Sequence, residues 1–105
     1  MNRDQFFTQI DSADLSYLID NAQESVILAM PGIQAEVATS LMKASHRLGK
    51  EMVIVCLDVN EQAMRLGYGD IQAVELLREN NIVIQHIDHL RFALIIADSE
   101  GYSFS

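Results

Sequence analysis

Three polar side chains late in the chain have the residue types that hold metal ions. His86, Asp88 and His89 lie close together, and alternate residues of a strand share one face, so His86 and Asp88 could act together. The remaining histidine, His46, lies on a distant predicted helix, and the single thiol, Cys56, lies within an apolar run. The set therefore falls short of a structural zinc site. We interpret these side chains as ordinary polar loop residues and assign neither a metal nor a cofactor.

A second segment, Gly67-Tyr68-Gly69-Asp70, could hold an anion. It lacks the third glycine and the preceding strand of a dinucleotide-binding fingerprint. We therefore interpret its glycines as residues that give the backbone conformational freedom before a helix. A helix that begins near Asp70 would still present free amides to an anion if Asp70 does not occupy them. Arg65 and Arg91 lie away from the main acidic runs and could supply positive charge to such a pocket.

The elements that must position these residues follow from the spacing of apolar side chains. The spacing predicts helices over residues 12–22, 33–48 and 70–79, and strands over residues 25–30, 51–57, 92–97 and 102–105. A further strand is expected to begin with residues 82–84. Ser12 is the expected N-cap of the first helix, and Gly49 the expected C-cap of the second. The run 25–30 is continuously apolar, which is the pattern of a strand buried on both faces, and 51–57 is a second buried strand.

Strands that alternate with helices predict an α/β fold. We expect a mixed, mainly parallel sheet with helices packed on it and a C-terminal antiparallel hairpin that turns at residues 98–101. Asp58 leaves the second buried strand at the end where open α/β sheets usually place their sites. The 105 residues suffice for one domain, spanning 1–105, and because the chain stops on a strand we expect a fragment of a longer protein.

Composition limits the partners. The formal net charge of −8 is opposite to what phosphate neutralisation requires, so we expect no nucleic-acid binding. The apolar runs are too short to cross a bilayer, and residues 1–4 carry an acid where a secretory signal needs a basic end. We therefore predict a cytoplasmic protein without membrane contact, in which Cys56 is a small buried hydrophobe.

The order of elements and two stretches near the C-terminus resemble a half-unit of the phospholipase D superfamily. The stretches are residues 89–98 and 101–105, and the resemblance covers nearly the whole chain. In that family a histidine attacks phosphorus, a lysine two positions later binds the phosphate, and an aspartate lies five positions beyond the lysine. Asp98 matches the aspartate, whereas Arg91 stands at the histidine position and Ala93 at the lysine position.

This departure from the family pattern implies a catalytically incomplete motif. Arginine is a permanent cation and no nucleophile, and alanine cannot hold a phosphate. His89 lies two residues too early to replace the missing histidine. Asp98 is then expected to have a structural role in capping the hairpin turn. Residues 65–70 also resemble a stretch of uncharacterised bacterial proteins with degenerate domains of this kind.

Two functions are consistent with these residues. The first is a non-catalytic binding, regulatory or dimerisation module in which the former phosphate pocket takes a small anion or pairs two domains. Its ligand-binding candidates are Arg65, Tyr68, Asp70 and Arg91. The resemblance also implies a homodimer or a second half-domain as partner. The alternative is the inert half of a phosphodiesterase whose intact catalytic motif lies beyond residue 105.

Overall fold

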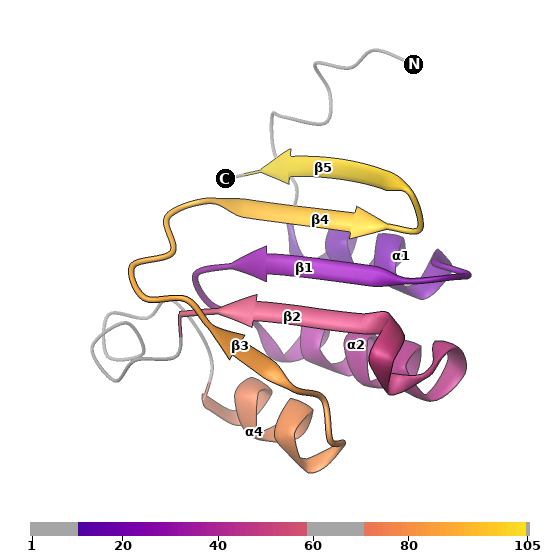
Figure 1. Cartoon of the computed structure of the whole chain (residues 1–105), viewed down its shortest axis with the longest axis horizontal. Helices are drawn as coiled ribbons and strands as arrows, with labels where there is room; N and C mark the ends of the chain where they lie inside the picture. Colours follow the sequence, from indigo (N-terminus) through magenta and orange to yellow (C-terminus); the bar gives the residue numbers. More distant parts are fainter. Residues whose placement is uncertain (1–10, 59–70, 105) are drawn as a thin grey trace.

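The computed structural model of the protein describes residues 11–58 and 71–104. Along the chain the elements are α1 (Ser12–Asn21), β1 (Val26–Met30), α2 (Ala35–Leu48), the short 3-10 helix η2 (Lys50–Met52), β2 (Val53–Leu57), α4 (Ile71–Glu79), β3 (Ile84–His86), β4 (Ala93–Ala97) and β5 (Glu100–Phe104). The strands form one sheet in the order β3-β2-β1-β4-β5 (Figure 1). The α/β class and the C-terminal hairpin are thus confirmed.

The sheet is mixed, but it is not mainly parallel. β1 pairs in parallel with β2, and β2 with β3. β4 lies antiparallel to both β1 and β5, so the parallel and antiparallel pairings are equal in number in the described sheet. The reason is that β4 returns along the free side of β1 instead of extending the parallel series beyond β3.

Local chemistry explains where the helices begin and end. Asp11, and not the expected Ser12, is the N-cap of α1, because its carboxylate accepts the amide of Asp14 at 2.9 Å while the Asp14 carboxylate accepts the amide of Asp11 at 3.2 Å. The second helix ends at Gly49 as predicted, with a φ of 103° that suits glycine. The expected N-cap at Asp70 lies outside the described residues.

A left-handed turn after α4 makes the third strand begin later than the predicted start at Ile82. Asn81 has a φ of 61°, its amide donates to the carbonyl of Arg78, and the amide of Ile82 donates to the carbonyl of Leu77. This is a Schellman ending, in which Ile82 packs back on its helix. Ile82 is buried and belongs to the helix end, so the strand starts only at Ile84.

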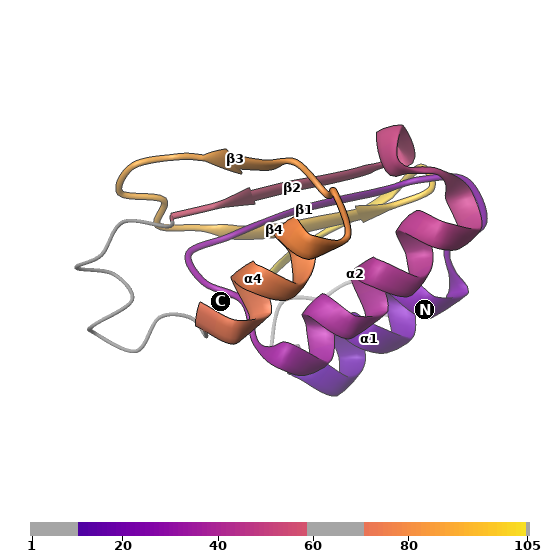
Figure 2. The same ribbon diagram turned by 90° about the horizontal axis from the view of Figure 1, so that it is seen from below.

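The three α-helices of the described chain cover the same face of the sheet (Figure 2). Alternate strand residues point to this face and are inaccessible to solvent, as are the apolar residues of the helices that meet them. The largest fully buried side chains are Ile19, Leu28, Ile33, Leu41, Leu57, Leu77, Ile95, Val26, Val37 and Val55. They form one core between the helices and the sheet.

Two polar contacts close the turn between α1 and β1. The Arg47 guanidinium donates from Nη2 to the carbonyls of Ile19 at 3.0 Å and Ala22 at 2.9 Å, so α2 holds the end of α1. The Asp98 carboxylate then accepts the amides of the three following residues: Gln23 at 3.1 Å, Glu24 at 2.6 Å and Ser25 at 3.2 Å.

The hydrogen bonds from Glu24, Ser25 and Gln23 lower the pKa of Asp98 below its ordinary value. The expectation that this carboxylate caps its own hairpin turn is wrong. Although Asp98 lies at that turn, with a φ of 60°, its side chain binds the backbone of a segment far away in the sequence. The amides of residues 23–25 need an acceptor because the chain there has left α1 and not yet entered β1.

We predict a pH-dependent contribution of Asp98 to stability. Because its pKa is lower in the folded chain, the ionised carboxylate stabilises the fold above about pH 4, and this stabilisation is lost as the pH falls from there through the lowered pKa. Urea unfolding of the wild type and of Asp98→Asn should therefore differ most near neutral pH and converge in acid. The exposed Asp20, changed to Asn, is the control; a gap for Asp98→Asn that stays constant with pH would contradict this account.

We also predict that Arg47→Met lowers the free energy of unfolding by about 1 kcal/mol, because two carbonyls at the end of α1 lose a charged donor. The matched control is Arg78→Met, since Arg78 is also exposed and lies in the last turn of its helix. Urea denaturation followed by circular dichroism measures both. Equal losses for the two variants would show that the bonds to α1 contribute nothing beyond a general helix-end effect.

Candidate functional site

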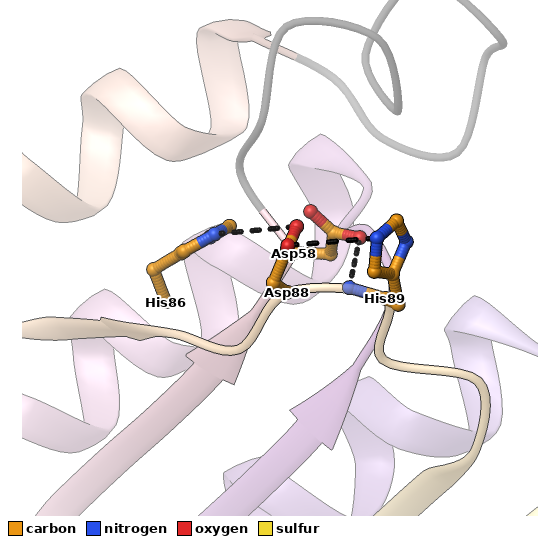
Figure 3. A network of polar contacts seen from close by, with 4 residues as sticks. All are labelled: Asp58, His86, Asp88 and His89. Carbon is orange, nitrogen blue, oxygen red and sulfur yellow. Dashed lines mark hydrogen bonds and ion pairs between the residues drawn. The ribbon is translucent and has the colours of Figure 1, made fainter.

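Four polar side chains lie together where β2 and β3 end, at the carboxyl ends of these strands. Asp58 directly follows β2, and His86, Asp88 and His89 lie at or just after the end of β3. β2 and β3 are parallel neighbours, so their carboxyl ends lie side by side. We call Asp58, His86, Asp88 and His89 the polar edge (Figure 3).

Backbone contacts fix the polar edge. The amide of Ile87 donates to the carbonyl of Leu57 at 2.9 Å, which continues the contact between the two strands beyond β3. The amide of His89 then donates to Asp58 Oδ2 at 3.1 Å, and the amide of Asp58 donates to the carbonyl of Pro31 at 3.3 Å. Asp58 is only 7% exposed, so these contacts hold a carboxylate that water hardly reaches.

The side chains of the polar edge lie within reach of one another. Asp88 lies between the two imidazoles, with His86 Nε2 at 3.9 Å from Oδ1 and His89 Nε2 at 3.5 Å from Oδ2. Asp58, His86 and Asp88 each offer a ligand atom, and these three atoms all lie within 4.8 Å of one another. His86 and Asp88 therefore lie close together, as their spacing in the sequence predicts, while their joint action stays a prediction.

Asp58 is the residue that sequence reasoning failed to add to this group. The signal was its position directly after a buried strand, at the end where sites in such sheets collect. What the sequence does not give is that β3 pairs with β2 and thereby brings His86 and Asp88 beside Asp58.

Of the ligand-binding candidates Arg65, Tyr68, Asp70 and Arg91, the described residues include Arg91 alone, so their grouping stays a prediction. Arg91 is exposed and lies just before β4, which places it at the same end of the strands as Asp58. Asp98 follows β4 and so lies at the opposite end of the strands, about 20 Å from Arg91 at the usual rise of a strand. Arg65, Tyr68 and Asp70 lie outside the described residues.

Ala93, which stands at the lysine position of the resembled motif, is buried. It shares a face with Ile95, which belongs to the core between sheet and helices. A side chain at position 93 is therefore directed into the protein interior.

The face of the sheet opposite the helices is the second notable surface. Its side chains come from the three central strands, and we call this set the open face: Ile27, Ala29, Ile54, Cys56, Leu94 and Ile96. Ile27 is the centre of the set, because it pairs with Ile54 on one side and with Ile96 on the other. In residues 11–58 and 71–104 all three α-helices pack on the other side (Figure 2).

The predicted burial of the central strands on both faces is therefore wrong for the described chain. Ile54 is 37% exposed and the small Ala29 is buried, whereas the other members of the open face, Cys56 included, are half-buried. The physical reason is that α1 and α2 lie on the same side of β1, so that both meet the same row of strand side chains. The expectation that Cys56 is a fully buried hydrophobe fails for the same reason.

Among the described residues, no helix combines the length and the apolar character that crossing a membrane requires. Comparison of the chain with known protein families, with curated proteins and with solved structures found no match.

Proposed function

We propose that this chain is a non-catalytic assembly module that forms a homodimer by stacking its open face on that of a second copy. The observation that carries the proposal is a mismatch between sequence and packing. β1, β2 and β4 have apolar side chains on both faces, yet the helices of the described chain cover only one of them.

Strands that face water usually alternate apolar and polar residues, whereas continuous apolar runs occur in strands that are covered twice. Ile27, Leu94 and Ile96 occupy positions that an alternating strand would give to polar side chains. Leaving such a surface in water is unfavourable by about 25 cal/mol for each Å² of apolar area. A covering surface is thus expected, and patches of this kind mark protein interfaces.

A second copy suits this surface better than another partner, because the open face contains no charged residue. The rest of the chain carries the net charge of −8, and contact through an uncharged patch avoids placing like charges of two copies against one another. A two-fold axis brings the same patch of each copy together, which requires a self-complementary surface, and a flat aliphatic patch meets that requirement. The product is a sandwich of two sheets about 10 Å apart, with the helices outside.

The non-catalytic part of the proposal has separate support. Arg91 and Ala93 stand where the resembled motif needs an imidazole and an amine, and Ala93 faces the core. The small-anion role remains a prediction. The alternative of an inert phosphodiesterase half also remains a prediction, because it depends on a sequence beyond residue 105.

We predict that Ile54→Lys converts a dimer into a monomer, because a lysine in the middle of an apolar interface must lose its hydration. Light scattering across a concentration series measures the mass. The matched control is Ile71→Lys, since Ile71 is 58% exposed on the helix side. Both variants change the net charge equally, so a difference between them cannot arise from the overall repulsion.

A constant monomer mass for the wild type would overturn the proposal, as would equal dissociation of both variants.

The salt dependence of the dimer mass gives an independent measurement. Because two acidic copies repel one another and the interface is apolar, added salt should strengthen association. The single thiol, Cys56, lies in the open face and supplies a third measurement, since its labelling should slow as the protein concentration rises. Labelling that is independent of concentration would contradict stacking through this face.

A further inference from the structure

We propose that Asp58, His86 and Asp88 form a binding site for a divalent transition metal of the zinc type. The site lies at the polar edge and not on the open face, so the proposal goes beyond the assembly role and does not depend on it. Its three ligand atoms come from the ends of two neighbouring parallel strands, where the fold converges side chains that are far apart in the sequence.

The spacing of the donors suits a small cation. The three ligand atoms lie within 4.8 Å of one another, and ligands of a tetrahedral zinc ion with bonds of about 2.1 Å are roughly 3.4 Å apart. Each pair therefore needs to close by no more than about 1.4 Å. Modest side-chain rotations can supply this movement, because the side chains of His86 and Asp88 are 43% and 62% exposed.

The remaining ligand is already in place. Asp58 is buried, and its carboxylate is oriented by the amide of His89 while its own amide is bound by the carbonyl of Pro31. A metal site is strengthened when hydrogen bonds fix its ligands in this way. The imidazole of His89, whose Nε2 lies 3.5 Å from Asp88 Oδ2, is placed to support the second carboxylate in the same manner.

The donor types decide between metals. Carboxylates alone would suit Ca²⁺ or Mg²⁺, which take oxygen ligands almost exclusively. The imidazole of His86 shifts the preference towards zinc and its first-row neighbours, for which mixed nitrogen and oxygen ligands are usual. Three protein ligands leave a fourth position for water or a small ligand, so the site is of the open kind.

The test is calorimetric titration of ZnCl₂ into the untagged protein. We expect one zinc ion per chain, no comparable heat with MgCl₂, and a loss of affinity of at least about tenfold in both His86→Ala and Asp88→Asn. These two residues are chosen because they are exposed, so that removing either leaves the fold intact, whereas a change of the buried Asp58 could unfold the chain. Circular dichroism confirms folding of each variant.

Matched controls come from the same chain. His46→Ala removes an exposed histidine on α2, Asp20→Asn removes an exposed aspartate on α1, and Cys56→Ser removes the thiol. All three should bind zinc as the wild type does. Absence of zinc binding, retention of full affinity in either His86→Ala or Asp88→Asn, or loss of affinity in any of the controls would overturn the site. Titration of Ile54→Lys should give the wild-type affinity, so that failure of the dimer and failure of the metal site can be told apart.

Discussion

The position of β1 between β2 and β4 constrains everything else in this structure. Its side chains alternate between the helix side, where Val26 and Leu28 are fully buried, and the open side, where Ile27 is surrounded by other aliphatic residues. The helices can satisfy only one of these two rows. Arg47 and Asp98 hold α1 and the start of β1 in the arrangement that seals the helix side. The apolar residues of the other side are then covered by none of the described α-helices.

The same strand pairing creates the polar edge. β2 and β3 run in parallel and end together. The hydrogen bond from the Ile87 amide to the Leu57 carbonyl continues their pairing into the loop after β3. The last contact of this series is the hydrogen bond from the His89 amide to the Asp58 carboxylate. A buried carboxylate is expensive unless it is hydrogen-bonded. Asp58 therefore fixes the conformation of the loop that carries Asp88, and in doing so it sets the distances among the potential ligands.

The sequence predicted what depends on local periodicity and missed what depends on distant pairing. The helix over 35–48 and its end at Gly49 follow from apolar spacing and a single glycine, and the C-terminal hairpin follows from its turn residues. By contrast, no local pattern shows that β4 would lie beside β1, that α1 and α2 would share a face, or that Asp98 would bind amides of residues 23–25. For this reason the sequence did not group Asp58 with the histidines. Its partners lie about thirty residues later, at the end of a strand whose pairing partner the sequence does not reveal.

A sheet can assemble through its edges or through its face, and the details of the outer strands favour the face. β3 has only three residues and its exposed side chains are polar, which makes it a poor template for another strand. On the other edge, β5 begins with the exposed carboxylate of Glu100, which accepts the hydroxyl of Tyr102 at 2.8 Å and raises the pKa of that tyrosine. A charge on an edge strand discourages pairing with another chain. With both edge strands protected in this way, the aliphatic row centred on Ile27 offers a face-to-face contact that needs no strand pairing.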